Sequence, residues 1–153
     1  MAARAAIDRA GPADVAAVER VVREAYEVYV ADIGRPPAPM TADYGALVRA
    51  GEVWVAREDG GVAGVLVIRA EGRALLLENV AVAPDRQGRG IGRALIDFAE
   101  EQARDLGLDE VTLYTNERMT GNLRLYPRLG YVETGRRVED GYARVFFRKP
   151  VDT

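Results

Sequence analysis

Apolar residues recur at alternating steps of three and four along residues 15–29, which is the spacing of one face of an α-helix. This stripe comprises Val15, Val18, Val22, Ala25 and Tyr29, widened by Val21 and Val28. The pattern predicts a long helical region, preceded by a short strand at residues 5–9. Gly34, Pro36, Pro37 and Pro39 then end the pattern.

Short apolar runs separated by turn residues follow this region. Thr41 is the expected cap of a second helix that ends at Ala50, and three strands are expected at residues 53–56, 61–69 and 73–82. The turn signals Asp59-Gly60-Gly61 and Glu71-Gly72 join consecutive strands. These residues therefore predict an antiparallel meander.

The helical spacing returns at residues 90–106, where the expected inward face is Ile91, Leu95, Phe98 and Leu106. A strand at residues 111–115 should return parallel to residues 73–82, because a helix connects the two. A short helix at residues 120–129 and a hairpin of residues 131–138 and 142–148 complete the chain. The order of elements predicts an α/β fold of the α+β type with a mixed, mostly antiparallel sheet.

Composition narrows the class of protein. The 153 residues fit one domain, expected over residues 1–153, with 48% apolar and 29% charged residues typical of a globular chain. A net charge of −3 argues against a nucleic-acid-binding surface. Residues 1–10 have no long apolar run, so no signal peptide and no membrane anchor are expected, and the expected location is the cytoplasm.

Cysteine and histidine are both absent from the sequence. No thiolate nucleophile is therefore expected, and zinc chemistry is not expected either. Carboxylates, tyrosines and water remain as the groups that can move protons. No metal ligand is assigned.

A glycine-rich turn joins the strand at residues 73–82 to the following helix, in the segment Val80-Ala-Val-Ala-Pro-Asp-Arg-Gln-Gly-Arg-Gly-Ile-Gly-Arg93. Glycines leave the backbone open to a ligand, and the helix turns unpaired N–H groups toward it, which favours a diphosphate. Arg86, Arg89 and Arg93 add positive charge. Neither the dinucleotide fingerprint nor the Walker loop fits the spacing, and a tight turn that binds nothing is the alternative.

Two motifs give the chain a family resemblance. Gln87, Gly90 and Gly92 form a Q-x-x-G-x-G run that resembles the acyl-CoA pyrophosphate loop of the GNAT superfamily of N-acetyltransferases. The run from Asn122 to Tyr131 is similar to the second signature of that superfamily, N-x-x-x-Y-x-x-x-G-[FY]. The order of elements also matches, so the resemblance covers nearly the whole chain.

The resemblance implies a sheet of six to seven strands with a splayed parallel pair, flanked by about four helices, and acetyl-CoA (coenzyme A) as the cofactor. By motif position, the backbone of residues 80–82 would contact the pantetheine arm and the turn would hold the pyrophosphate. The implied cofactor-binding residues are Val80, Ala81, Val82, Arg86, Gln87, Gly88, Arg89, Gly90, Ile91, Gly92, Arg93, Asn122, Leu125, Tyr126 and Arg128. For Asn122, capping of the short helix is the alternative.

Glu78 and Tyr126 are the candidate catalytic residues. Glu78 interrupts an apolar strand, so desolvation should raise its pKa and make it a base for the acceptor amine, unless it forms an ion pair with an arginine. Tyr126 matches the tyrosine that, in many superfamily members, protonates the departing thiolate, and a core tyrosine is the alternative. Pro127 follows directly and predicts distorted helical geometry at Tyr126.

Acceptor recognition is expected from variable segments, with candidate substrate-binding residues Tyr26, Tyr29, Glu78, Tyr114 and Tyr142. The predicted function is transfer of an acetyl group from acetyl-CoA to a primary amine of a small molecule or peptide. A noncatalytic acyl-CoA-binding regulatory module is the alternative, and a nucleotide-binding protein is a more remote one. An exposed edge strand in the last hairpin suggests a homodimer.

Overall fold

A computed structural model describes residues 6–152 of the chain. The fold is a mixed α/β fold whose seven-stranded sheet has the order β1-β2-β3-β4-β5-β7-β6. Its strands are β1 (Ala6–Arg9), β2 (Val53–Glu58), β3 (Gly61–Glu71), β4 (Ala74–Val82), β5 (Glu110–Asn116), β6 (Val132–Glu139) and β7 (Tyr142–Pro150). Its α-helices are α1 (Val15–Tyr26), α2 (Val30–Ile33), α3 (Tyr44–Arg49), α4 (Ile91–Asp105) and α5 (Thr120–Arg128).

The predicted parallel pair is confirmed. Ala74 to Leu77 of β4 pair in parallel with Glu110 to Leu113 of β5, whereas the pairs β1–β2, β2–β3, β5–β7 and β6–β7 are antiparallel. The expected fold class is therefore confirmed.

The chain divides into two compact units: the first comprises Met1–Ile68 and Asn79–Phe98, and the second comprises Arg69–Glu78 and Ala99–Thr153. The single-domain organisation expected from the length stays a prediction.

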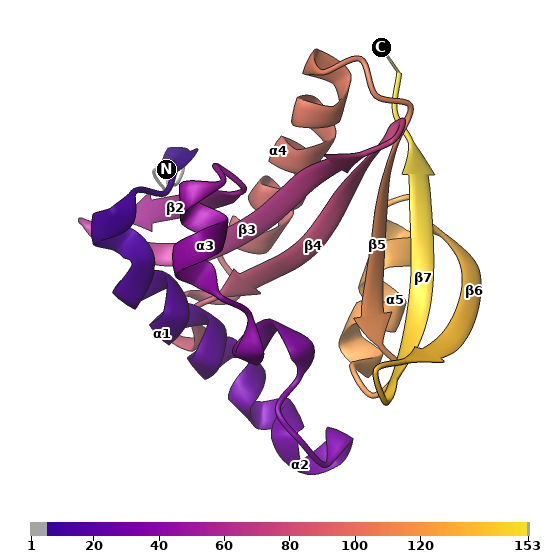
Figure 1. The fold of residues 1–153 in the computed structure, drawn as a ribbon, viewed down its shortest axis with the longest axis horizontal. Coiled ribbons are helices and arrows are strands. Elements are labelled where there is room, and N and C mark those ends of the chain that lie inside the picture. The colour runs from indigo at the N-terminus through magenta and orange to yellow at the C-terminus, as the bar shows by residue number, and fades with distance from the viewer. Residues whose placement is uncertain (1–5, 153) are drawn as a thin grey trace. The chain divides into compact units, whose positions relative to one another are not determined.

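The first unit packs helices on both faces of β2 and β3. Figure 1 shows α1 and α3 on one face and the first part of α4 on the other. Val18, Val21 and Val22 of α1 are fully buried, as the predicted stripe requires. On the opposite face Gly64 of β3 brings the backbone against α4, because a Cβ atom there would lie only 2.9 Å from Leu95 Cδ1.

The second unit is built on β5, β7 and β6. Val111, Leu113, Val145 and Phe147 are buried in it, and Tyr126 of α5 packs its ring 5.8 Å from that of Phe147. The β6–β7 hairpin turns at Asp140, whose φ is 53°, and Gly141, whose φ is 80°. These are the left-handed conformations that a two-residue hairpin turn needs, so the hairpin turn predicted from Asp140-Gly141 is confirmed.

Three expectations about individual residues were wrong. Val28 and Leu106 are 70% and 59% exposed, because each lies beyond the regular part of its helix, where the 3.6-residue repeat no longer sets direction. The helix expected to start at Thr41 starts at Tyr44, and Asp43 caps it by accepting a hydrogen bond from the Ala46 amide at 3.0 Å. Thr41 Oγ1 donates instead to Ala38 O.

Within residues 6–152, no helix has the length and apolar character needed to cross a membrane.

Candidate functional site

The turn between β4 and α4 is open. The short 3-10 helix η4 (Pro84–Arg86) leads into it, and Gly88 and Gly90 both adopt φ of 82°, a left-handed conformation that glycine adopts without strain. Nothing lies within 4 Å of a Cβ built at either glycine. Gln87 Nε2 donates to Val82 O at 3.3 Å, and Ala94 N donates to Gly90 O at 3.0 Å, which starts α4.

These features fit the diphosphate of coenzyme A. Residues 87–90 are exposed, so their backbone amides are accessible, and α4 extends for 15 residues from the turn. A helix of this length directs unpaired N–H groups and the positive end of its dipole toward its N-terminus. A Cβ atom at Gly92 would lie 3.4 Å from Val82 Cγ2, an ordinary van der Waals contact, so packing alone does not require glycine there.

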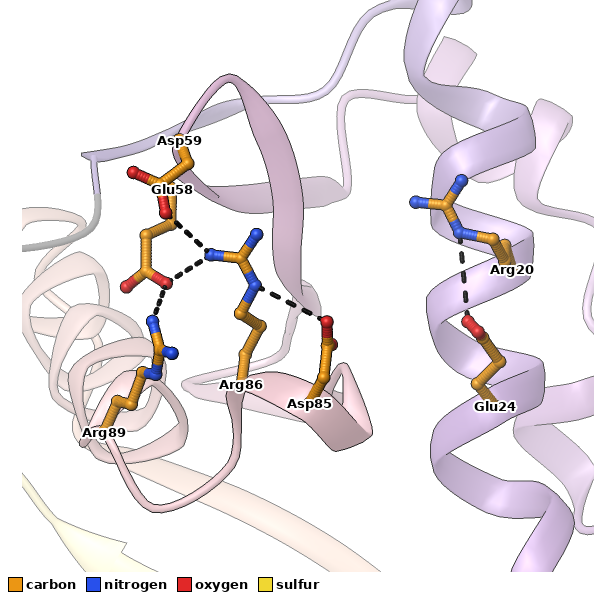
Figure 2. A network of polar contacts seen from close by, with 7 residues as sticks. All are labelled: Arg20, Glu24, Glu58, Asp59, Asp85, Arg86 and Arg89. Atoms are coloured by element: carbon orange, nitrogen blue, oxygen red, sulfur yellow. Dashed lines mark hydrogen bonds and ion pairs between the residues drawn. The ribbon is translucent and has the colours of Figure 1, made fainter.

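The arginines of the turn already have carboxylate partners. Arg86 donates through Nη1 to Glu58 and, at 3.2 Å, to Asp59, while Arg89 Nη1 donates to Glu58 at 2.8 Å (Figure 2). Arg93 lies 3.8 Å from Asp97. The hydrogen bond to Glu58 raises the pKa of Arg86 above its ordinary value. The sequence showed a cluster of positive charge, whereas the structure shows a cluster in which charges are largely balanced.

The residues of β4 that follow Glu78 belong to the first unit, where the side chain of Asn79 is buried. Tyr26 OH donates to Asn79 Oδ1 at 2.6 Å and lies 3.0 Å from Val80 O, and Asn79 Nδ2 donates to Tyr44 OH at 3.0 Å. This network connects α1 and α3 with the strand expected to contact pantetheine. Tyr26 is thus an interior residue, and Tyr29 packs its ring 6.5 Å away.

Glu78 belongs to the second unit and forms the ion pair that was the alternative to a free base. Arg69 Nη1 contacts Glu78 Oε2, and Arg69 Nη2 donates to Glu78 Oε1 at 3.3 Å. Arg69 also donates to Glu71 at 3.4 Å, and the hydrogen bond to Glu78 raises the pKa of Arg69 above its ordinary value. The arginine uses one lone pair on each Glu78 oxygen, which leaves others for a proton or a water.

Tyr114 and Tyr142, two other candidate residues of the second unit, both lie near the guanidinium of Arg144. Arg144 lies 4.4 Å from the centre of the Tyr114 ring and 5.7 Å from the centre of the Tyr142 ring. Arg144 also donates to Glu139 at 3.1 Å. Burial raises the pKa of Tyr114. Leu77 of β4 pairs with Leu113 of β5, so Glu78 and Tyr114 are the next residues on two neighbouring parallel strands. The structure therefore brings Glu78, Tyr114 and Tyr142 into one region of the second unit.

Tyr126 lies on α5, with only 4% of its surface exposed. Its ring packs edge-on against Tyr131 at 5.6 Å. No residue among 6–152 forms a hydrogen bond with its hydroxyl group. Burial raises the pKa of Tyr126 well above that of a free phenol, so the hydroxyl keeps its proton at neutral pH.

The distortion expected from Pro127 was wrong. Helix α5 continues through Pro127 to Arg128, with Tyr126 inside it. The proline lies in the last turn, where its missing N–H removes a single helical hydrogen bond and the Leu129 amide still bonds to Leu125 O and Tyr126 O. Tyr126 therefore lies within the helix.

The other residues of the second motif surround Tyr126 on α5. Asn122 Nδ2 donates to Thr115 Oγ1 at 3.1 Å, and the N-cap position is Met119, so the capping alternative for Asn122 was wrong. Leu125 is 39% exposed, and Arg128 is exposed. Both side chains remain available to a ligand, and their contact with the cofactor stays a prediction.

Sequence reasoning missed Glu58 and Gly64. Glu58 directly precedes the Asp59-Gly60 turn and looks like an ordinary polar residue of a hairpin, although 83% of its side chain is buried against the arginines. In the sequence, Gly64 is a residue that disfavours strand structure, whereas in the structure it is where α4 packs against β3. In each case the partners lie 27 to 31 positions away along the chain, which no local pattern reveals.

Comparison with known proteins defines the class. Residues 49–133 match the family model described as the acetyltransferase (GNAT) domain. Over 94 residues the chain is 34% identical to N-acetyltransferase 8 of Mus musculus, covering 58% of this chain and 41% of that one. Over 52 residues it is 44% identical to the mycothiol acetyltransferase of Geodermatophilus obscurus, covering 34% of this chain and 17% of that one. The matched segments thus span less than half the length of these curated relatives.

Solved structures give the same class over nearly the whole chain. A putative GNAT acetyltransferase from Desulfovibrio desulfuricans superposes with a TM-score of 0.77 at 25% identity, covering 96% of this chain and 99% of that one. The ribosomal-protein-S18-alanine N-acetyltransferase of Escherichia coli also superposes with a TM-score of 0.77, at 21% identity, covering 97% and 94%. The fold and the turn define an acetyltransferase-type protein. The chain belongs to the GNAT acetyltransferase family.

Proposed function

We propose that this chain is an N-acetyltransferase that moves an acetyl group from acetyl-CoA to a primary amine of a small molecule or peptide. The observation that carries the proposal is the open turn in which Gly88 and Gly90 adopt φ of 82° before α4. Backbone amides and a helix N-terminus at this position suit a diphosphate. The resemblance to the two GNAT motifs supports assigning the turn to the cofactor's diphosphate and, separately, Tyr126 to its sulfur. Acetyl-CoA supplies the activated acetyl thioester.

The proposed reaction is direct attack of the amine on the thioester carbonyl. A C–N bond forms, the C–S bond breaks, and the amine loses one proton while the sulfur gains one. Glu78 accepts the amine proton through a water molecule, using lone pairs that Arg69 leaves unoccupied. Tyr126, which burial keeps protonated, donates a hydrogen bond that stabilises the negative charge developing on the departing thiolate. The sulfur takes up its proton from solvent, which balances the proton that the amine gives up.

Tyr114 and Tyr142 are the residues of the second unit proposed to contact the acceptor. Their rings flank Arg144, so they offer aromatic surface beside a positive charge that Glu139 partly balances. Tyr26 and Tyr29 remain proposed contributors from the first unit, with Tyr26 acting chiefly by supporting the strand at Val80. Pairing of two copies through β6, whose Val132 and Val138 are exposed, stays a prediction.

Titration calorimetry combined with a thiol-release assay tests the function. The protein should bind acetyl-CoA and CoA in preference to ATP and NAD, and it should release free thiol with at least one class within a panel of amines, peptides and aminoglycosides. Binding without release for any amine would favour the noncatalytic module. Absence of CoA binding would contradict the proposal.

Substitution of Glu78 by glutamine should lower kcat by about 100-fold, because general-base catalysis contributes roughly 10² to 10⁴ in rate. Glu71→Gln is the matched control, since Glu71 also contacts Arg69 but is 55% exposed at its side chain. The control should keep kcat within about twofold, as expected for an exposed ion pair. Equal effects of the two substitutions on steady-state thiol release would assign Glu78 to support of Arg69 rather than to proton transfer.

A further inference from the structure

Glu58 joins two arginines of the diphosphate turn through one carboxylate oxygen. It is the last residue of β2, and its Oε1 accepts hydrogen bonds from Nη1 of Arg86 and, at 2.8 Å, from Nη1 of Arg89 (Figure 2). Its side chain is 17% exposed, and that of Arg86 is 24% exposed. Glu58 therefore forms a partly buried bridge from the β2–β3 hairpin to the two arginines that flank Gln87-Gly88 in the sequence.

The bridge leaves much of each guanidinium unoccupied. An arginine carries five N–H donors, and Glu58 receives only Nη1 from each residue. Arg86 makes its other contacts through Nη1 with Asp59 and, at 3.9 Å, through Nε with Asp85, and Arg89 makes no further ion pair among residues 6–152. Both side chains are thus fixed at one nitrogen and keep donors available for a second anion.

We propose that Glu58 is a positioning residue for the diphosphate: it holds Arg86 and Arg89 beside the glycine turn so that their remaining N–H groups bind the cofactor's phosphates. This inference rests on the proposed function. A free arginine side chain loses about 2 kcal/mol of rotamer entropy when it becomes ordered, and Glu58 has already ordered two of them before the ligand binds. Partial burial strengthens the hold on Arg86, whose side chain is 24% exposed, because one partner of a buried ion pair is costly to leave alone. The side chain of Arg89 is 54% exposed, so solvent screens its pair with Glu58 more strongly.

The opposite role makes the opposite prediction. If Glu58 were only a competing anion, its neutralisation would free two positive charges, and coenzyme A would bind more tightly. A positioning role predicts weaker binding despite the added positive charge. The sign of the change in affinity therefore distinguishes the two roles.

The test is calorimetric titration of coenzyme A into the wild-type chain, Glu58→Gln and Glu24→Gln. Glu24 forms an exposed ion pair with Arg20 on α1 at 3.9 Å, so its substitution makes the same change in net charge away from the turn (Figure 2). Glu58→Gln should weaken coenzyme A binding about fivefold to tenfold, and Glu24→Gln should change it less than about twofold. Tighter or unchanged binding by Glu58→Gln would overturn the proposal.

Two further measurements separate positioning from damage to the fold. The Glu58→Gln penalty should shrink to about twofold in an Arg89→Ala background, because contacting residues do not contribute additively. Pantetheine, which lacks the phosphates, should bind Glu58→Gln and wild type alike. An undiminished penalty in the Arg89→Ala background, or an equal loss for pantetheine, would contradict the proposal. Failure of the wild-type chain to bind coenzyme A would instead count against the proposed function.

Discussion

Replacement of Gly64 by alanine is expected to lower the free energy of unfolding by about 2 kcal/mol, within the range for overpacked cores. A Cβ atom at this position would lie 2.9 Å from Leu95 Cδ1, 3.0 Å from Ile91 Cγ2 and 3.3 Å from Ala81 O. Leu95 is fully buried and Ala81 O belongs to the backbone, so neither can move freely away. Urea denaturation followed by circular dichroism measures the loss.

Gly135→Ala is the control for this substitution. Gly135 also lies in a strand, β6, but it is exposed and nothing lies within 4 Å of a Cβ built on it. That variant should match or slightly exceed wild-type stability, because alanine restricts the unfolded chain more than glycine does. If Gly64→Ala cost no more than Gly135→Ala, then α4 would be able to shift without penalty.

The packing at Gly64 also bears on the diphosphate turn. Ile91 is the first residue of α4 and follows Gly90 directly, so a shift of Ile91 displaces the helix end that the turn presents. Preorganised backbone donors lose strength quickly when they move from their positions. The stability of this contact and affinity for coenzyme A should therefore decline together in Gly64→Ala.

The sequence alone was sufficient to predict those features whose structure depends on residues close together along the chain. The 3.6-residue stripe of α1, the Asp-Gly turns and the helix that connects β4 to the parallel β5 depend on local spacing and on a general rule of chain connection. The glycine turn belongs to the same class, because the left-handed φ of Gly88 and Gly90 is one that glycine adopts without strain. These features were predicted with nearly correct boundaries.

Pairings between distant residues could not be predicted in this way. Glu78 was expected either as a base or as a partner of some arginine, and only the structure identifies Arg69. The sequence shows how many arginines lie near the turn, but it does not show which carboxylates pair with them. Glu58, for example, precedes its partner Arg86 by 28 positions. Charged side chains reach several ångströms in any direction, so their periodicity carries little information about what they contact.

Substitution of Tyr126 by phenylalanine is expected to lower kcat by about 10- to 100-fold while affinity for acetyl-CoA changes by less than about twofold. The ring keeps its packing against Tyr131 and Phe147, and only the hydroxyl is lost. Stability should hardly change, because that hydroxyl has no hydrogen-bond partner among residues 6–152. Steady-state thiol release and calorimetric titration measure the two quantities separately.

The pH profile adds a second test of the same role. Burial raises the pKa of Tyr126, so the residue is protonated at every pH below the ordinary phenol value of about 10. Tyr126→Phe should therefore lower kcat by one constant factor between pH 6 and pH 9, without moving the midpoint of any limb. A shifted midpoint would mean that Tyr126 titrates during catalysis and is not a permanently protonated hydrogen-bond donor.

Tyr131→Phe supplies the contrast, because it removes the same atom from the same aromatic cluster. Tyr131 OH donates to Glu100 Oε2 at 3.0 Å, and Lys149 Nζ donates to the other oxygen of this buried carboxylate at 2.9 Å. That variant should lose about 1 to 2 kcal/mol of stability, since Glu100 is left with one unpaired oxygen, yet keep its kcat. Opposite patterns in the two variants would assign the Tyr131 hydroxyl to the fold and the Tyr126 hydroxyl to the reaction. A normal kcat in Tyr126→Phe would remove Tyr126 from the proposed mechanism, because the thiolate would then depart without needing a hydrogen bond from that hydroxyl.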